Sequence, residues 1–151
     1  MTHDLSWKPD LTVAAICERD GRFLLVEECA KSTQKIVLNQ PAGHIESGES
    51  IIQAVKRETL EETQRHFTPV SVIGLYRLAA DNGKTYFRYT FNGEVSKIDQ
   101  SEERDPDILN THWLTLDQIK QADNLRSPLV LSCIEDYLSG EHYPLDLLKE
   151  L

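Results

Sequence analysis

Three glutamates close together in the chain, Glu58, Glu61 and Glu62, are the residues whose types and spacing most clearly suggest chemistry. The segment from Ile51 to about Thr63 is predicted to be a helix, and at about 100° per residue the three carboxylates share one face. That face also carries the apolar residues of the helix's first half, so it points toward a core rather than into solvent. Like charges three and four residues apart repel one another, and this arrangement therefore needs a nearby cation.

A divalent metal ion is the cation that this residue set predicts. Arg57 is the only basic residue adjacent to Glu58, and one guanidinium cannot neutralise three carboxylates. The segment offers carboxylate oxygens without histidine or cysteine, and hard ions such as Mg²⁺ or Mn²⁺ prefer such ligands. We therefore expect the glutamates to bind Mg²⁺ or Mn²⁺.

The wider pattern resembles the Nudix box of the Nudix hydrolase superfamily, which reads G-x5-E-x7-R-E-U-x-E-E-x-G-U, with U an aliphatic residue. Its glycine and charged positions up to the last glutamate are matched at the required spacing by Gly43, Glu49, Arg57, Glu58, Glu61 and Glu62. Three positions differ, because Thr59 and Arg65 replace aliphatic residues and Gln64 replaces the second glycine. That glycine normally ends the helix in the left-handed region. With Gln64, we expect the helix either to continue toward His66 or to end at a cost of about 1 kcal/mol.

The resemblance implies a fold, a cofactor and a set of roles. The implied fold is an α/β (α+β) domain, a Nudix-like α/β/α sandwich with a mixed β-sheet, spanning residues 1–151 as a single domain. The implied cofactor is Mg²⁺, for which Mn²⁺ can substitute, and the attacking group is water. The implied metal ligands are Glu58, Glu61, Glu62 and the carbonyl of Gly43. The implied catalytic set consists of these glutamates with Arg57, which orients Glu58, and Glu49, which supports the site from the start of the helix.

Three further segments, residues 38–44, 124–130 and 139–145, resemble the NudJ branch of bacterial Nudix phosphatases. This implies Mg²⁺-dependent hydrolysis of nucleoside tri- and diphosphates and of a pyrimidine pyrophosphate of thiamine synthesis. Two alternatives stay open: an ADP-ribose or dinucleotide pyrophosphatase, and a Nudix-fold module that binds a nucleotide without hydrolysing it. The intact glutamate cluster argues against the binding module. The sequence does not decide whether orthophosphate or pyrophosphate is released.

Three residues are candidates for substrate binding: His44, Arg88 and Arg126. His44 could equally be a hydrogen-bonding loop residue. Arg88 alternates with aromatic residues on a predicted strand, where a structural ion pair is favoured over a phosphate clamp. Arg126 belongs to one of the NudJ-like segments.

The general base is either Glu58 or an acid of the irregular stretch 96–110, such as Asp105 or Asp107. Long loops in compact domains are often functional, which makes this stretch a candidate part of the site. A P-loop is excluded, because Glu49 occupies the position of its phosphate-binding lysine.

Strands and helices alternate along the chain and must position these residues. Predicted strands cover residues 11–18, 23–28, 36–38, 71–79, 85–91 and 111–114. Turns at Asp20-Gly21 and residues 81–83 join the first two strands and the 71–79 and 85–91 strands into hairpins. Helix starts are indicated by two capping boxes and one Ser-Pro pair, at Ser50 with Gln53, Thr115 with Gln118, and Ser127-Pro128. Gly140 is expected to end the last helix.

Composition limits the class of partner. The chain has 16 Lys and Arg against 25 Asp and Glu, a net charge of −9, and no basic run offsets it. Such a charge repels nucleic acid and anionic membrane surfaces, so we expect a small nucleotide or pyrophosphate as partner, bound by a monomer or homodimer. Three scattered cysteines and an N-terminus, Met1 to Asp4, without signal-peptide features indicate a cytoplasmic protein.

Overall fold

A mixed four-stranded β-sheet lies at the centre of the fold. The computed structural model describes residues 3–151, so Met1 and Thr2 of the N-terminal stretch considered above lie outside it. The strands run in the order β5 (Ala42–His44), β1 (Asp10–Ile16), β7 (Thr85–Val95) and β6 (Phe67–Ala79). β1 and β7 are parallel and the other neighbours are antiparallel, which confirms the predicted mixed sheet.

A second, antiparallel sheet is built around β3 (Arg22–Ala30), which pairs with β2 (Glu18–Arg19), β4 (Lys35–Asn39) and β8 (Ile108–Thr115). The turn at Asp20-Gly21 is confirmed, and both of its residues have positive φ, 51° and 75°. The predicted pairing of residues 11–18 with 23–28 is present only next to the turn, where Glu18 pairs with Phe23 and the Leu24 amide donates to the Cys17 carbonyl at 3.0 Å. For the rest of the first strand it is wrong. The two edges of β1 are occupied by β5 and β7, so only the short β2, after the first sheet ends, can pair with β3.

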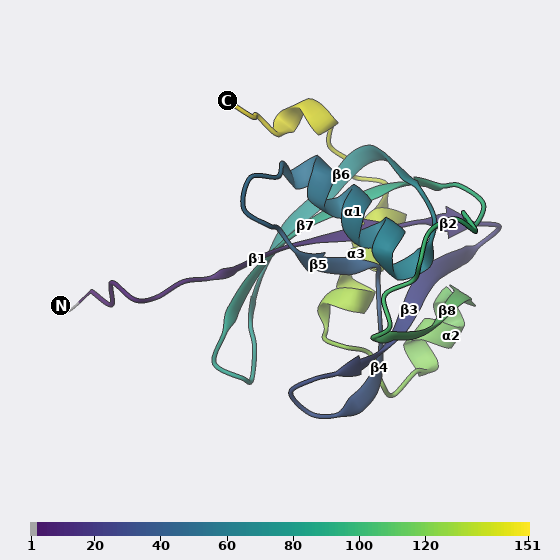
Figure 1. Cartoon of the computed structure of the whole chain (residues 1–151), viewed down its shortest axis with the longest axis horizontal. Coiled ribbons are helices and arrows are strands. Elements are labelled where there is room, and N and C mark those ends of the chain that lie inside the picture. Colours follow the sequence, from purple (N-terminus) through teal and green to yellow (C-terminus); the bar gives the residue numbers. More distant parts are fainter. Residues whose placement is uncertain (1–2) are drawn as a thin grey trace.

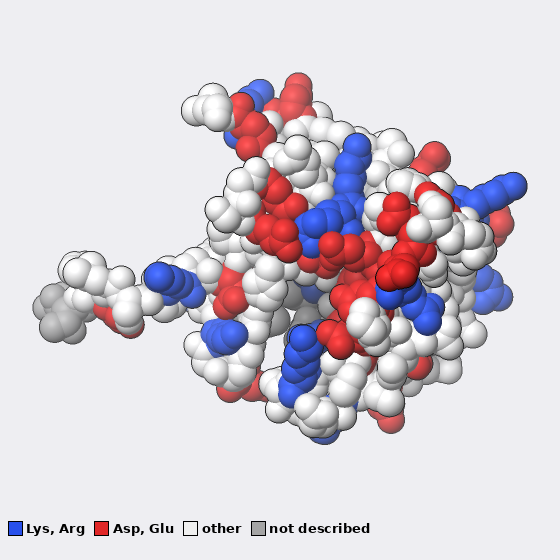
Figure 2. Space-filling model, in the orientation of Figure 1, with Lys and Arg blue, Asp and Glu red and all other residues white. Residues whose placement is uncertain are grey.

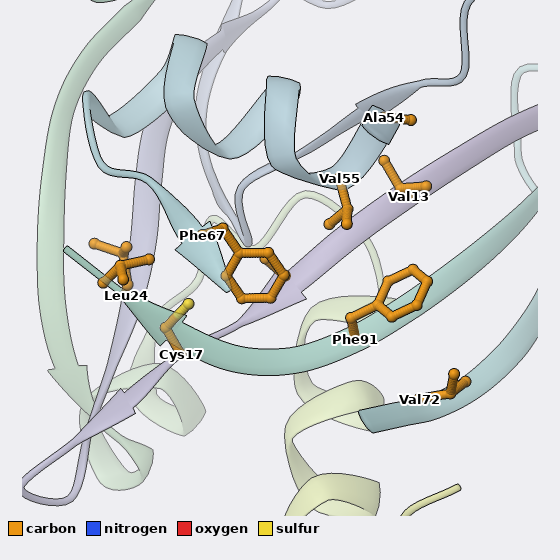
Figure 3. Close-up of a cluster of buried hydrophobic side chains, with 10 residues drawn as sticks. Val13, Cys17, Leu24, Ala54, Val55, Phe67, Val72 and Phe91 are labelled. Carbon is orange, nitrogen blue, oxygen red and sulfur yellow. The ribbon is translucent and has the colours of Figure 1, made fainter. Parts of the chain in front are cut away.

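Helices cover both faces of the central sheet (Figure 1). α1 (Ile51–Thr63) packs against β1, β5 and β6, whereas α3 (Leu129–Ser139) packs against β6 and β1. Val13 of β1 joins Phe67 and Phe91 in the core beneath α1 (Figure 3), while Ile16 belongs to the core beneath α3. β1 is therefore buried on both faces, which explains its continuous apolar run. The layered α+β fold is confirmed.

All three predicted helices are present. The predicted capping boxes begin α1, at Ser50 with Gln53, and α2 (Leu116–Gln121), at Thr115 with Gln118. Gly140 ends α3 in the left-handed region with φ 85°, as expected. In residues 3–151, no helix is both long enough and apolar enough to cross a membrane.

The remaining elements refine the prediction. The hairpin of β6 and β7 is confirmed, and both strands extend beyond their predicted ends. α3 begins at Leu129, after Pro128, and the Leu129 amide donates to Ser127 Oγ at 3.2 Å. β2, β5 and a 3₁₀ turn, η1 (Leu145–Leu147), were not predicted.

Candidate active site

Gly43 and Glu58 approach each other where β5 passes beneath α1. β5 pairs with β1, where Gly43 lies opposite Val13, and α1 packs on both strands. A Cβ atom added to Gly43 would overlap the carboxyl group of Glu58. The close approach therefore requires glycine at position 43 and fixes the Glu58 side chain against the β5 backbone.

The Arg57 guanidinium holds this part of the site together. Its Nε and Nη2 donate to the two carboxylate oxygens of Glu49, at 2.9 and 2.7 Å. Its Nη1 donates to Glu58 Oε1 at 2.8 Å and to Glu61 Oε2 at 3.2 Å. Nη2 also donates to the carbonyl oxygen of His44 at 2.9 Å. Every nitrogen of this guanidinium is thus used within the protein.

The carboxylates around Arg57 have pKa values shifted in opposite directions. The hydrogen bonds from Arg57 lower the pKa of Glu49, and those with Glu49 raise the pKa of Arg57 further above its usual range. Burial raises the pKa of Glu58 even though Arg57 opposes the shift. Glu49 is thus held as an anion beside Arg57, whereas Glu58 is a stronger base than an ordinary glutamate.

Glu62 is a buried carboxylate without a cationic partner. Its residue surface is 6% exposed, and its Oε1 accepts a hydrogen bond from the Ala42 amide at 2.8 Å. No ion pair to Glu62 is formed within residues 3–151. Burial raises its pKa well above the usual value, and the charges of Glu28, Glu58 and Asp105 raise it further. An unbalanced buried carboxylate of this kind is a suitable ligand for a divalent cation.

The three box glutamates do not close around one point. Their side chains are graded in exposure, since Glu61 is 48% exposed and Glu58 is 15% exposed, while Glu62 is buried. Two threonines of α1, Thr59 and Thr63, are buried as well. The buried face of α1 therefore includes Glu62 and these threonines, whereas Glu61 lies at the edge of that face. In the described chain, the one trio of metal-ligand side-chain atoms lying within 4.8 Å of one another is His66, Asp99 and Glu102.

The irregular stretch 96–107 packs against the end of α1. The Asp105 amide donates to the Glu61 carbonyl at 2.7 Å, and the Asp105 charge contributes to the raised pKa of Glu62. Asp107 instead forms an exposed ion pair with Lys31 at 3.2 Å. Of the two loop acids predicted as alternative bases, Asp105 is the one beside the glutamates.

Gln64 ends α1 where the motif has glycine. Its backbone is left-handed, with φ 59° and ψ 24°, so the helix stops at Thr63 rather than continuing toward His66. Its Nε2 donates to the Glu102 carbonyl at 2.7 Å, and its own carbonyl accepts from the Asp99 amide at 2.8 Å. These bonds offset the backbone cost and attach the 96–107 loop to the helix end.

Thr59 and Arg65, the other departures from the motif, are accommodated differently. Thr59 is fully buried, and its hydroxyl donates to the Val55 carbonyl at 2.8 Å, so it fills an aliphatic position without an unpaired polar group. Arg65 lies over the Trp113 ring, 5.6 Å from its centroid.

Arg88 is buried without a carboxylate partner. It is 6% exposed, and its Nη1 and Nη2 donate to Gln40 Oε1 at 3.1 Å and Asn39 Oδ1 at 3.2 Å. Its Nε has no hydrogen-bond partner. The expected structural ion pair is therefore wrong for the part of the chain described. Burial lowers the pKa of this guanidinium, because desolvation disfavours the charged form.

Arg126 reaches the site through Glu28, a residue that the sequence prediction missed. The loop before α3 pairs with β4, since the Arg126 amide donates to the Leu38 carbonyl at 2.8 Å. Arg126 Nη1 then donates to Glu28 Oε1 at 2.7 Å, and Asn39 Nδ2 lies 3.5 Å from the same oxygen. The available signal was the pair Glu27-Glu28 interrupting an apolar strand.

The His44 side chain forms the loop contact that was one of its two predicted roles. Its Nε2 lies 2.9 Å from Asp10 Oδ1, and the side chain is 61% exposed. Its carbonyl, rather than its ring, contacts Arg57. Substrate binding by the ring stays a prediction.

Acidic side chains gather around α1 and the 96–107 loop, on the face of the molecule shown in Figure 2, and they border a hollow. In that region, Glu58 and Glu62 have raised pKa values and Arg57 has no free nitrogen. The arrangement can bind a divalent cation and accept a proton.

Comparison with known proteins identifies the family. The family model described as the NUDIX domain matches residues 8–131, which is most of the chain. The chain belongs to the Nudix family. Phosphatase NudJ of Escherichia coli K12 is 38% identical over 144 residues, covering 95% of this chain and 93% of NudJ. A Nudix hydrolase structure from Nitrosomonas europaea is 48% identical with a TM-score of 0.91, covering 95% of this chain and 98% of that one.

The Nudix fold is also shared with more distant structures. The MutT protein of Methanosarcina mazei Go1 has a TM-score of 0.75 at 20% identity, covering 91% of this chain and 99% of that one. The matched range 8–131 contains every predicted site residue from Gly43 to Arg126. The predicted resemblance is confirmed, and this Nudix chain is a hydrolase of phosphorus-containing anhydrides.

Proposed function

We propose that this Nudix enzyme hydrolyses phosphoanhydride bonds of nucleoside tri- and diphosphates and related pyrophosphates, with Mg²⁺ as its cofactor and Mn²⁺ as a substitute. The observation that carries the proposal is the Glu62 carboxylate, buried beside Glu58 and Asp105 without any cationic partner in residues 3–151. Three carboxylates that repel one another near a core are destabilising unless a cation balances their charge.

The residues present fit a divalent ion of the hard class. Glu58, Glu61, Glu62 and the carbonyl of Gly43 would hold it, all through oxygen atoms. When bound, the ion supplies positive charge to the phosphate oxygens and acidity to the attacking water. Because this protein is strongly acidic, that positive charge is also what allows a polyanionic substrate to approach.

Arg57 and Glu49 are positioning residues in this proposal. The two-oxygen contact with Glu49 fixes the plane of the Arg57 guanidinium, and Nη1 then holds one oxygen of Glu58. The other Glu58 oxygen makes no hydrogen bond within residues 3–151. Glu58 thus keeps one carboxylate oxygen available for a ligand or a proton.

The base that takes the proton of the attacking water is either Glu58 or Asp105. Burial raises the pKa of Glu58, which brings it closer to the pH at which a general base is most effective. Asp105 is attached to the Glu61 backbone and lies near Glu62. Asp107 is a weaker candidate, because it pairs with Lys31 on the surface.

The proposed substrates follow from the likeness to the NudJ phosphatase, at 38% identity over nearly the whole chain. They include the pyrimidine pyrophosphate of thiamine synthesis, and stepwise release of orthophosphate is the expected pattern. The alternatives are an ADP-ribose or dinucleotide pyrophosphatase and a nucleotide-binding module. The unbalanced charge at Glu62 supports hydrolysis with a metal over simple binding.

The test is a product analysis with the full chain. The protein is incubated with Mg²⁺ and a panel of nucleoside tri- and diphosphates, the pyrimidine pyrophosphate, ADP-ribose and a dinucleotide. We expect orthophosphate from the first three classes, and no turnover after exhaustive EDTA treatment. Full activity after EDTA would contradict the metal requirement. Hydrolysis of ADP-ribose or the dinucleotide alone would favour the pyrophosphatase, and no turnover at all would favour the binding module.

We further propose that the protein acts in the cytoplasm on small molecules, as a monomer or homodimer that binds no nucleic acid or membrane. Its cysteines Cys17, Cys29 and Cys133 are all free thiols, which suits a reducing compartment. Its net charge of −9 disfavours nucleic acid and anionic lipid.

A further inference from the structure

Arg57, the cation nearest to the box glutamates, has no nitrogen left for substrate. All of its guanidinium nitrogens donate to Glu49, Glu58, Glu61 or the His44 carbonyl. A phosphorylated substrate extends beyond the phosphate held at a metal site, and its other oxyanions need donors as well. Those donors must come from other residues.

Two guanidiniums, of Arg126 and Arg88, are linked through the single carboxylate of Glu28 and the amide of Asn39. Arg126 Nη1 donates to Glu28 Oε1 at 2.7 Å, and Asn39 links the same oxygen to Arg88, through contacts of 3.5 and 3.2 Å. Their proximity is also apparent in the pKa of Arg88, which the charge of Arg126 helps to lower. This group carries a net positive charge, whereas the group around Arg57 carries a net negative one.

Both guanidiniums keep unused donors. Arg88 is 6% exposed, donates to two neutral amide oxygens, and has a buried Nε without a hydrogen-bond partner. Arg126 uses one terminal nitrogen on Glu28, and its Nε and Nη2 donate no side-chain hydrogen bond to residues 3–151. The Arg126 side chain is 42% exposed, so these nitrogens can be reached from solvent. A buried cation that lacks a carboxylate partner is costly unless a ligand balances it.

Glu28 connects this pair to the proposed metal site through its charge. Its charge is one of those that raise the pKa of Glu62, and its side chain is only 15% exposed. The charge of Glu62 thus interacts with that of Glu28, and Glu28 is hydrogen-bonded to Arg126 and to Asn39. Asn39 in turn accepts a hydrogen bond from Arg88. A substrate phosphate held at the glutamates would have its neighbouring oxyanions on the side of the two arginines.

We propose that Arg126 and Arg88 form an anion-binding subsite for the substrate phosphate oxygens that the glutamate cluster does not hold. The inference rests on the proposed function, and it assigns the residues that bind the part of the substrate phosphates lying beyond the metal site. Arg126 makes the direct contact, because its free nitrogens are accessible. Arg88 adds a second positive charge behind it, fixed by Asn39 and by Gln40, which is itself bound to the Val130 carbonyl.

Steady-state kinetics and inhibition by inorganic pyrophosphate test the subsite. For Arg126→Gln, we expect KM for a hydrolysed nucleoside triphosphate to rise about tenfold or more, because a charge-assisted contact is lost. Inhibition by pyrophosphate should weaken by the same factor, whereas kcat and the Mg²⁺ concentration for half-maximal activity stay within about threefold. Glu28→Gln keeps both guanidiniums and removes the competing carboxylate, so it should tighten pyrophosphate binding.

Arg22→Gln is the matched control, an exposed arginine at the opposite end of β3, and it should behave as wild type. Unchanged KM and pyrophosphate inhibition in Arg126→Gln would overturn the proposal. So would a raised KM with normal pyrophosphate inhibition, since that would indicate contact with the nucleoside instead. Arg88→Gln, if folded by its melting curve, should weaken pyrophosphate inhibition too, and a normal value would exclude Arg88 from the subsite.

The outcome is separable from that of the proposed function. Calorimetric titration of the wild-type protein with pyrophosphate and Mg²⁺ needs no turnover, so it can be compared with Arg126→Gln even if no substrate is hydrolysed. Equal affinities in the two proteins would reject the subsite, whereas inactivity toward the substrate panel would reject only the hydrolase assignment.

Discussion

Arg57 and Arg88 have opposite surroundings within one Nudix site. Arg57 is partly exposed and donates to three carboxylates and a carbonyl. Arg88 is more deeply buried, yet it has only amide oxygens as acceptors and one nitrogen without any. The difference teaches that charge balance, rather than burial, separates a guanidinium that positions neighbouring carboxylates from one whose charge is left for a ligand to balance.

The glutamates show the same contrast with the opposite sign. Glu49 is paired through both oxygens with Arg57, which lowers its pKa, whereas Glu62 has no cation and its pKa is raised well above normal. The balanced group formed by Arg57 and Glu49 fixes the geometry. The unbalanced groups are Glu62, where a cation is expected to bind, and Arg88, whose charge is expected to support anion binding at Arg126.

Arg57→Lys removes the balanced group and should have the largest effect. An ammonium cannot make the two-oxygen contact with Glu49 and also hold Glu58, so we expect kcat to fall about 10–100-fold in a Mg²⁺-dependent assay. Lys56→Gln, on the exposed side of the same helix, is the control and should retain wild-type kinetics. Wild-type kinetics in Arg57→Lys would show that Arg57 is an ordinary surface residue.

Glu62→Gln removes an unbalanced charge and should stabilise the protein without metal. The folded pKa of Glu62 lies above its unfolded value of about 4.5, so its carboxyl favours folding at low pH and loses that contribution as pH rises through the folded pKa. In EDTA, the variant should melt above wild type at pH 7.5, and the two should converge near pH 4. Glu61→Gln, at a half-exposed and paired position, should change melting little. A lower melting temperature for Glu62→Gln at pH 7.5 would contradict the charge imbalance.

Substitutions of Gln64 test whether the end of α1 is stabilised by hydrogen bonding and limited by backbone strain, independently of the site charges. We expect them to change stability less than the substitutions above change activity or melting. Gln64→Ala loses the bond to Glu102 and keeps the left-handed backbone, so we expect about 1–2 kcal/mol of destabilisation in urea unfolding. Gln64→Gly loses the same bond but relieves the backbone, so its stability should stay within about 1 kcal/mol of wild type. Equal losses in both variants would show that strain at Gln64 is negligible.

Local patterns in the sequence were sufficient to predict α1. Its capping box at Ser50, its 3.6-residue period and the Nudix spacing of its glutamates are all short-range signals. The direction of its buried face was predicted less well, because the three glutamates were expected to share one face toward the core and the Glu61 side chain is 48% exposed. The 96–107 loop bonds to the backbone of Glu61 and Gln64 at the helix end, and no local pattern contains those contacts.

Long-range pairing explains what the sequence could not provide. Residues 11–18 formed a plausible hairpin with 23–28, but β1 pairs with β7, more than seventy residues away. Glu28 joins the site through its contact with Arg126, which spans 98 residues. Such a residue is identified by the fold and not by a motif.

The response of thermal stability to Mg²⁺ tests the central claim, that the cluster containing Glu62 binds a divalent ion, most directly. At pH 7.5 and a Mg²⁺ concentration about a hundredfold above Kd, the wild-type melting temperature should rise by about 5–10 °C. Glu62→Gln should respond much less, and Glu94→Gln, an exposed position on β7, should respond as wild type does. Equal shifts in all three proteins, or no shift in wild type, would contradict the account.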